Sequence, residues 1–224
     1  MRRIFAFFLC LVLVGVPPVR SESPRYVALT FDDGPSGRFT RRLLTGLQER
    51  DAKATFLLCG YRLEIYPELA KRILAEGHEI GLHGYSHKDM AKLSRRELTK
   101  EIKDTIALLP QGCEPVFLRP PGGSESSLVS TLAAEMELAL LNWSVDPRDW
   151  AVHDAAVVET AVISQVRSGD VILLHDLSDS SVDAALSIVD KLQEEGFHFV
   201  TVSQLARLRG ITPQPGKTYH HFRQ

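Results

Sequence analysis

Short apolar runs alternate with longer amphipathic stretches along most of the chain, and this alternation constrains the fold more than any other feature. Seven runs have the length and residue types of β-strands, at residues 26–31, 54–58, 78–82, 116–119, 139–143, 171–174 and 198–200. Six amphipathic stretches predict helices, at residues 37–50, 66–76, 94–109, 126–135, 155–167 and 181–195. Such alternation predicts an α/β fold with a parallel sheet, either doubly wound or closed as a barrel. About seven units favour an incomplete or distorted (β/α) barrel.

The size and charge of the chain limit its organisation and its partners. The 224 residues suffice for one sizeable domain, and nothing in that length requires two. Because no internal repeat, low-complexity tract or interdomain linker is visible, residues 24–224 are predicted to form a single domain. The net charge of −2 gives no electrostatic reason to expect nucleic acid or an anionic membrane surface as a partner.

Residues 1–23 differ in composition from the rest of the chain. Arg2 and Arg3 precede an uncharged apolar run at residues 4–16, and a Pro-containing polar stretch follows, which is the layout of a secretory signal peptide. The apolar run is short for a membrane span, which needs about 20 residues. Without a clear Ala-x-Ala cleavage site, an uncleaved N-terminal anchor stays open. We therefore predict export to the periplasm, the cell envelope or the outside, with the membrane as a partner only if the segment is not cleaved.

Cys59 and Cys113 lie outside this N-terminal segment. Export permits a disulfide, but a domain with a full core does not need one. Cys59 follows one predicted strand and Cys113 precedes another, which would place them at opposite ends of parallel strands. We therefore favour two free thiols and leave the pairing open.

Polar side chains follow five of the predicted strands at their carboxyl ends. In parallel α/β folds the loops at these ends meet at one rim, where functional groups gather. The candidates at this rim, in chain order, are Asp32, Asp33, His83, His87, Arg119, Asp146, Asp149, Trp150 and His175. Trp143 is instead predicted to belong to the core or to the edge of the domain. The Pro- and Gly-containing segment after Leu208 is expected to pack as an extended cover or to fray.

A carboxylate pair and a histidine pair together indicate a metal site at this rim. The adjacent carboxylates of Asp32 and Asp33 repel one another, and both stay ionised only when a cation neutralises them. A capped turn before the following Gly-Pro pair is the alternative explanation. His83 and His87 are four residues apart, so one turn of helix would place both imidazoles on one face. One Asp and two His leave a coordination position for water, which is typical of a catalytic metal site.

Such a site can hydrolyse a substrate. A metal with an open coordination position lowers the pKa of its water from about 15.7 toward about 7, and the remaining carboxylate can take the proton of that water. His175 closes the run DVILLH at the same rim and can return the proton to a leaving amine or alcohol. A solvated histidine after a buried strand is the alternative for His175.

Five short motifs carry a more specific signal. TFDDGP, HGYSH, RPPGG, DPRDW and LLH, in this order, resemble the signature motifs of the polysaccharide deacetylases, carbohydrate esterase family 4, which contain the nodulation-factor deacetylase homology domain. The resemblance spans roughly residues 26–208. It implies that Asp32 is the general base and His175 the general acid. Asp33, His83 and His87 would bind the metal.

The resemblance also implies supporting roles. Arg119 would orient and ion-pair the catalytic carboxylate, and Asp149 would tune the catalytic histidine. Trp150 and Leu173 would line an apolar pocket for the acetyl group. The metal and a backbone N–H after Pro121 would stabilise the oxyanion that forms during hydrolysis.

Two glycines depart from the pattern of the family. Gly122 stands where the family often has an aromatic residue, and Gly84 stands where it often has Ser or Thr. Gly122 keeps its backbone N–H but removes one side wall of the pocket, while Gly84 removes a hydroxyl near the metal. Neither residue is an expected ligand, so these departures concern the choice of substrate rather than catalysis.

The function implied is a metal-dependent hydrolase that removes N-acetyl groups from a polysaccharide such as peptidoglycan, a chitin-like glycan or poly-N-acetylglucosamine. A polysaccharide O-acetyl esterase acting on a xylan-like substrate is one alternative, and a non-catalytic glycan-binding module is another. The cofactor would be one divalent ion. Zinc is favoured, and cobalt, nickel and manganese suit the same ligands.

Overall fold

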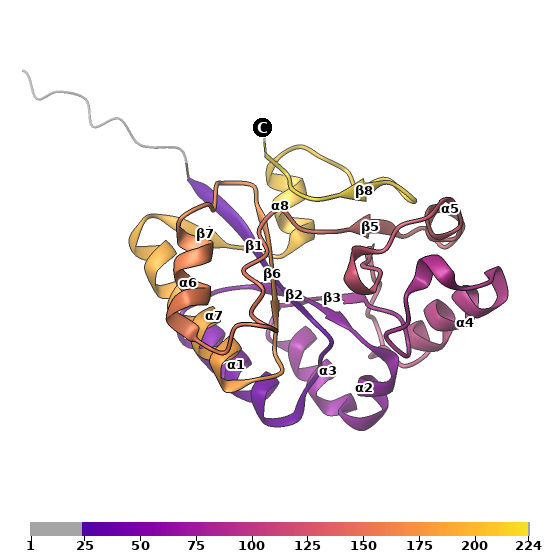
Figure 1. The fold of residues 1–224 in the computed structure, drawn as a ribbon, viewed down its shortest axis with the longest axis horizontal. Coiled ribbons are helices and arrows are strands. Elements are labelled where there is room, and N and C mark those ends of the chain that lie inside the picture. Colours follow the sequence, from indigo (N-terminus) through magenta and orange to yellow (C-terminus); the bar gives the residue numbers. More distant parts are fainter. Residues whose placement is uncertain (1–23, 224) are drawn as a thin grey trace, which may run out of the picture.

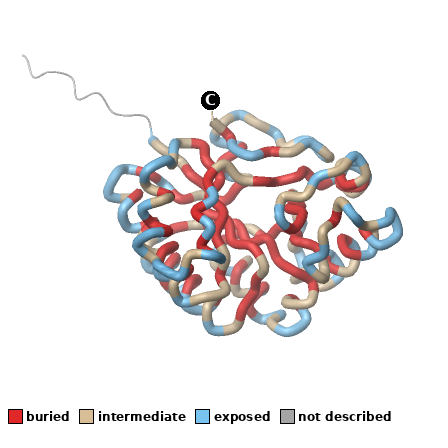
Figure 2. Tube along the Cα trace, in the orientation of Figure 1, coloured by how far each residue is buried: buried red, intermediate tan, exposed pale blue. Residues whose placement is uncertain are grey.

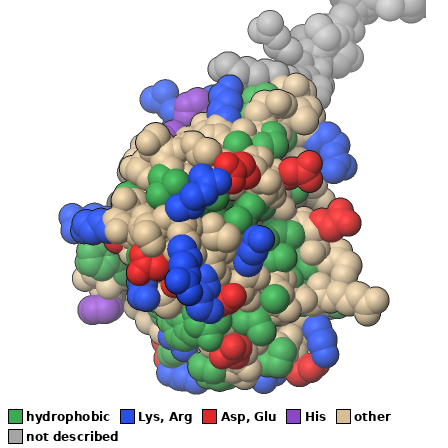
Figure 3. Space-filling model, turned by 90° about the vertical axis from the view of Figure 1, so that its right-hand side faces the viewer, with side chains coloured by type: hydrophobic (Ala, Val, Ile, Leu, Met, Phe, Trp, Pro, Cys, Tyr) green, Lys and Arg blue, Asp and Glu red, His purple; other side chains and the backbone are tan. Residues whose placement is uncertain are grey.

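The computed structural model describes residues 24–223, so the predicted signal peptide or anchor at residues 1–23 lies outside the described part. Within residues 24–223, no helix is both long and apolar enough to cross a membrane. On the face toward which α4 (Arg95–Ile106) and α5 (Ser127–Glu135) lie, positive and negative side chains are interspersed (Figure 3).

A curved parallel sheet forms the centre of the protein (Figure 1). Its strands are β1 (Arg25–Asp32), β2 (Ala54–Leu58), β3 (Glu79–Leu82), β4 (Phe117–Leu118), β5 (Ala139–Leu141), β6 (Val171–His175), β7 (Phe197–Phe199) and β8 (Thr218–Tyr219). The order is β6-β1-β2-β3-β4-β5-β8, with β7 paired to the start of β1, and these pairs are all parallel. Each predicted strand overlaps one of β1 to β7, and the parallel sheet confirms the incomplete (β/α) barrel.

Helices connect the strands and pack outside the sheet. Besides α4 and α5, the helices are α1 (Gly37–Glu49), α2 (Gly60–Ile65), α3 (Pro67–Ala75), α6 (Ala155–Ile163), α7 (Asp179–Glu194) and α8 (Val202–Leu208). Two short 3₁₀ turns are η1 (Met90–Lys92) and η2 (Pro121–Gly123). The six predicted helices correspond to α1, α3, α4, α5, α6 and α7. The short helices α2 and α8 were not predicted. α8 nevertheless has a sequence signal, because Thr201 and Gln204 form a capping box at its start.

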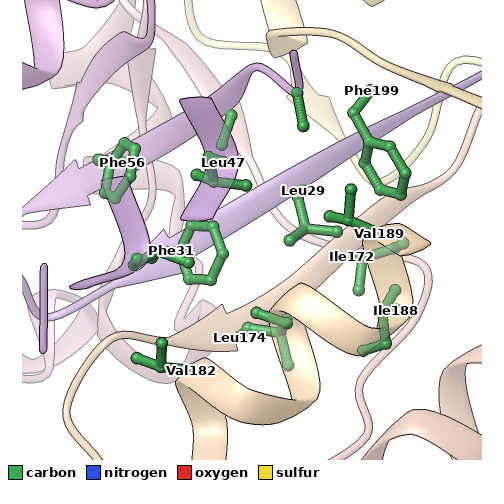
Figure 4. Packing of buried hydrophobic residues seen from close by; sticks show 14 of the residues in the cluster. Leu29, Phe31, Leu47, Phe56, Ile172, Leu174, Val182, Ile188, Val189 and Phe199 are labelled. Atoms are coloured by element: carbon green, nitrogen blue, oxygen red, sulfur yellow. The ribbon is translucent and has the colours of Figure 1, made fainter. Parts of the chain in front are cut away.

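The main core lies between the sheet and the helices that follow β1 and β6. Figure 2 shows buried residues along the strands and on the inward sides of the helices. In Figure 4 the apolar side chains of β1, β2 and β6 pack together, and the rings of Phe31 and Phe56 stack 5.3 Å apart. Burial of each large apolar side chain contributes about 1.5–3 kcal/mol to folding. The strands that carry the rim residues are therefore rigid.

The end of the chain completes the sheet beside β5. β8 pairs with β5, and His221 then forms an antiparallel bridge with Asp170 at the start of β6. Phe222 is fully buried and stacks on Tyr219 with ring centroids 5.3 Å apart. The segment after Leu208 thus packs and adds a strand that was not predicted, because its Pro and Gly residues hid a short apolar pattern. Elsewhere, Cys59 and Cys113 are free thiols, as we favoured.

We predict that Phe222→Ala destabilises the protein by about 3–5 kcal/mol, because it removes a buried ring and leaves a cavity. His220→Ala, which removes an exposed neighbouring side chain, is the control and should change stability by less than about 0.5 kcal/mol. Urea unfolding of both variants and the wild type measures the difference. Equal midpoints for the two variants would show that the C-terminal segment does not pack on the sheet.

Candidate metal centre and active site

Three of the rim residues stand at the ends of two neighbouring strands. Asp32 is the last residue of β1 and His175 the last of β6, and the register of this strand pair sets them side by side. Asp33 follows directly, with a φ of 70° that turns the chain out of the strand. Because β1 is buried from Val27 onward, Asp32 sits on a fixed support.

Asp33 forms a cluster with the two histidines of the segment HGYSH. One ligand atom from each of Asp33, His83 and His87 lies within 4.8 Å of the other two. The Oδ1 atom of Asp33 is 3.3 Å from Nε2 of His83 and 3.0 Å from Nε2 of His87. This oxygen is buried, yet it has no hydrogen-bond partner among residues 24–223. A divalent cation fits here, because it would pair the buried oxygen and bind the two nitrogens.

The protonation of His83 suits metal binding. Its Nδ1 atom lies 2.7 Å from the carbonyl oxygen of Arg119. A carbonyl oxygen only accepts hydrogen bonds, so Nδ1 carries a proton, and in the neutral imidazole Nε2 is the nitrogen left to bind a metal on the side of Asp33. His83 is almost fully buried, whereas the side chain of His87 is 45% exposed.

The two histidines keep the carboxylate of Asp33 ionised. Burial acts to raise the pKa of Asp33, but interactions with His83 and His87 lower it more strongly, so this pKa lies well below its ordinary value. The Asp33 carboxylate raises the pKa of His87 in return. Asp33 therefore stays ionised over the whole physiological pH range.

The segment HGYSH differs from the prediction in one respect. We expected one turn of helix, but residues 83–87 form a loop in which Gly84 has a φ of 79° and His87 a φ of 56°. A Cβ atom at Gly84 would lie 2.6 Å from the Cε atom of Met90. Both the backbone angle and this close neighbour therefore explain why glycine occupies the position. The two imidazoles meet because of the loop and not because of helical periodicity.

Arg119 holds Asp32 from behind the site. The fully buried guanidinium donates through Nη1 to Oδ1 of Asp32 at 2.6 Å and to the hydroxyl of Thr30 at 2.9 Å. Its Nε and Nη2 donate to the carbonyl oxygens of Leu141 and Asn142. Burial lowers the pKa of Arg119, and Asp32 opposes that effect. The second oxygen of Asp32, Oδ2, is 3.6 Å from Nε2 of His83, on the side of the metal cluster.

His175 is held by a second buried carboxylate. Oδ1 of Asp149 lies 2.9 Å from Nδ1 of His175, and Oδ2 accepts the backbone N–H of the same residue at 2.9 Å. Burial acts to lower the pKa of His175, but Asp149 raises it more strongly, to about 9. The imidazole is therefore protonated at neutral pH.

A cavity of about 460 Å³ joins these groups. Its lining comprises Asp32, Asp33, His83, His87, Gly122, Trp143, Asp146, Trp150, Leu173 and His175. Arg119 and Asp149 lie behind this lining, and the predicted pocket residue Pro121 is buried beside Gly122 without lining the cavity itself.

Trp143 is the site residue that the sequence reading missed. It packs partly against the core as expected, and it also lines the cavity, with its ring 5.6 Å from the guanidinium carbon of Arg119. Its place after the carboxyl end of β5 was the available signal, because that is where the other rim residues stand.

Comparisons with known proteins identify the family of the chain. The family model for polysaccharide deacetylase matches residues 20–141. The chain is 36% identical over 201 residues to the peptidoglycan-N-acetylmuramic acid deacetylase PdaC of Bacillus subtilis, a match that covers 88% of this chain and 42% of that protein. It is 37% identical over 194 residues to a peptidoglycan-N-acetylglucosamine deacetylase of Bacillus cereus, with 84% of this chain and 91% of that protein covered.

One solved structure is similar in both fold and sequence. A family 4 acetyl xylan esterase from Clostridium thermocellum, in complex with a cobalt ion, superposes with a TM-score of 0.82 at 33% identity and covers 88% of this chain and 98% of that one. The family model covers more than half of the chain, and both curated relatives exceed 30% identity. The chain therefore belongs to the polysaccharide deacetylase family, carbohydrate esterase family 4.

Proposed function

We propose that this protein is a metal-dependent hydrolase that removes N-acetyl groups from a cell-wall glycan, with peptidoglycan as the first candidate. The observation that carries the proposal is the convergence of Asp33, His83 and His87 beside a buried carboxylate and a protonated histidine. The names of the two Bacillus relatives support peptidoglycan as the substrate. A signal peptide or anchor at residues 1–23, followed by a catalytic domain at residues 24–224, would place the activity outside the cytoplasm.

The metal would be held by Asp33, His83 and His87. Zinc suits one carboxylate and two imidazoles, and cobalt, nickel or manganese can bind the same ligands. The ion would act as a Lewis acid toward the acetyl carbonyl and would make water more acidic.

Asp32 is the general base in this proposal. Arg119 occupies its Oδ1 atom, so Oδ2 is the oxygen available to take a proton from the attacking water. The contact with the buried guanidinium also fixes the orientation of the carboxylate, so Oδ2 points toward the metal cluster. Water then adds to the acetyl carbon as Asp32 takes its proton.

His175 is the general acid. Its Nδ1 atom is engaged by Asp149, so Nε2 is the nitrogen that can donate a proton to the leaving group. When the bond between the acetyl carbon and the sugar nitrogen breaks, the nitrogen keeps the electron pair and receives this proton. The products are acetate and a free amine.

The cavity wall fits a small acyl group. Trp150 and Leu173 provide apolar surface for the acetyl methyl group, and the backbone N–H of Gly122 is available for the oxyanion. A Cβ atom at Gly122 would have no neighbour within 4 Å, so this wall is open and leaves room for a substituted sugar.

An O-acetyl esterase is the second candidate, because one of the solved structures similar to this chain belongs to an acetyl xylan esterase. The metal ligands, base and acid proposed here would serve ester hydrolysis equally well. The two candidates differ in the bond that is cleaved and therefore in the substrate that releases acetate.

We expect purified, zinc-reconstituted protein to release acetate from peptidoglycan and from chitin oligomers, and a chelator to stop this release until zinc is returned. Acetylated xylan, assayed in parallel, tests the esterase. Acetate released from acetylated xylan, but from neither peptidoglycan nor chitin oligomers, would contradict the N-deacetylase and support the O-acetyl esterase. No acetate from any of the three substrates at any added metal would contradict both.

We predict that Asp32→Asn lowers kcat by at least about 100-fold, because the general base is lost. Zinc binding should persist, since Asp33, His83 and His87 are unchanged. Acetate assays and zinc titration of the same preparation measure both properties. Loss of zinc binding in this variant would show that Asp32 is a ligand and would overturn the assigned division of roles.

We predict that Asp149→Asn moves the alkaline limb of the kcat/KM profile to lower pH by at least about one pH unit. The acid must be protonated, so activity falls as pH rises through the pKa of His175, which Asp149 holds at about 9. Without that carboxylate, burial lowers the pKa. Asp154→Asn, which changes an exposed helix cap, is the control. An unmoved limb would mean that His175 is not the acid.

A further inference from the structure

The loop between His83 and His87 needs an external support. His83 is fixed by its place after β3 and by the carbonyl oxygen of Arg119. His87 lacks such a support: it is half exposed, and its ring contacts Oδ1 of Asp33. Because residues 83–87 are not helical, helical hydrogen bonds do not fix the distance between the two imidazoles. The position of His87 therefore depends on what holds Gly84, Tyr85 and Ser86.

Two elements hold this loop from opposite sides. On one side, the backbone N–H groups of Gly60 and Tyr61 at the start of α2 donate to the carbonyl oxygens of Gly84 and Tyr85, at 2.9 and 3.0 Å. On the other side stands one carboxylate from α4.

That carboxylate belongs to Glu101. Its Oε2 atom accepts the backbone N–H groups of Tyr85 at 2.8 Å and Ser86 at 2.7 Å, and its Oε1 atom accepts the hydroxyl of Ser86 at 2.5 Å. Glu101 is only 8% exposed. A buried carboxylate is costly unless it is hydrogen-bonded, so the three donors must stay in place for the charge to be tolerated.

The support for Glu101 is itself rigid. α4 begins with a capping box formed by Ser94 and Glu97. Its buried residues Leu98 and Ile102 lie in the same apolar cluster as Leu82, which directly precedes His83. α4, which carries Glu101, and β3, which leads into the loop, are thus packed together.

We propose that Glu101 is a positioning residue for the metal centre: it fixes the loop so that His87 meets Asp33 and His83 at ligand distance. This inference rests on the proposed function, because it assigns Glu101 a role toward the same metal ion. Glu101 does not contact the ion and acts through the backbone of Tyr85 and Ser86. Groups that hydrogen-bond a metal ligand directly contribute about 10- to 100-fold to metal affinity, and we expect an effect of this order from Glu101, which fixes the backbone next to the ligand.

Glu159 provides a matched control. It is also a helical glutamate that is 8% exposed, and its carboxylate accepts hydrogen bonds from Ser187 and Lys191. It belongs to α6 and lines no part of the cavity. A loss of stability alone should therefore be similar for Glu101→Ala and Glu159→Ala, whereas a positioning role affects only the former.

The experiment measures zinc affinity by chelator competition and the visible absorption of the cobalt-substituted protein, with thermal unfolding of the metal-free protein beside them. Glu101→Ala should bind zinc about 10- to 100-fold more weakly and change the cobalt spectrum. Glu101→Gln should stay close to wild type, because its amide oxygen can accept both backbone N–H groups. Glu159→Ala should leave both metal readouts unchanged.

Three results would overturn the inference, and they are distinguishable. If wild type binds zinc and Glu101→Ala binds it equally well with an unchanged cobalt spectrum, Glu101 has no positioning role and the metal centre stands. If wild type itself binds neither zinc nor cobalt, the proposed function fails and the role of Glu101 fails with it. Should Glu101→Ala not fold, a Glu101→Gln variant with weak zinc binding and wild-type stability would also contradict the assigned contacts.

Discussion

The buried guanidinium of Arg119 is the interaction on which the rest of the site depends. It donates to Asp32 and Thr30 of β1 and to the carbonyl oxygens of Leu141 and Asn142 at the end of β5, while its own carbonyl oxygen fixes His83. One residue therefore joins groups from β1, β3 and β5. A buried charge is tolerated only when it is fully paired. A shift of one of these strands would break a hydrogen bond to the guanidinium and leave its buried charge incompletely paired. The rim owes its geometry to this requirement.

The sheet also places two rim residues with different partners, Asp32 and His175, next to one another. The β1–β6 register makes Asp32 and His175 neighbours, yet each is paired with a different partner behind the cavity. Asp149 raises the pKa of His175 and keeps the imidazole protonated, whereas Arg119 occupies one oxygen of Asp32 and leaves the other free. In the proposed mechanism, this difference gives His175 the role of the acid and Asp32 the role of the base.

The sequence was sufficient to locate seven of the strands and to gather the candidate residues at one rim, because hydrophobic periodicity and residue types are local properties. Asp33, His83 and His87 meet as their spacing suggested, although the helix inferred from that spacing is a loop. The conformation of the loop depends on Met90 and Glu101, which are distant in the chain and could not be read from HGYSH. The role of Glu101 was missed for the same reason, since it arises only through tertiary contacts. β8 was missed because Pro and Gly hid its short apolar pattern, and Trp143 because its place after β5 was not read as a rim position.

The position of β8 also matters while the chain is being synthesised. This strand covers the edge of β5, and an uncovered parallel edge offers free N–H and C=O groups to other chains. Because β8 and Phe222 follow every rim residue along the chain, that edge is covered only after the strands that carry the rim have been synthesised. A chain that stops before β8 would keep its full set of rim residues and still expose a template for aggregation. Quality control could therefore discard such a chain despite its intact chemistry.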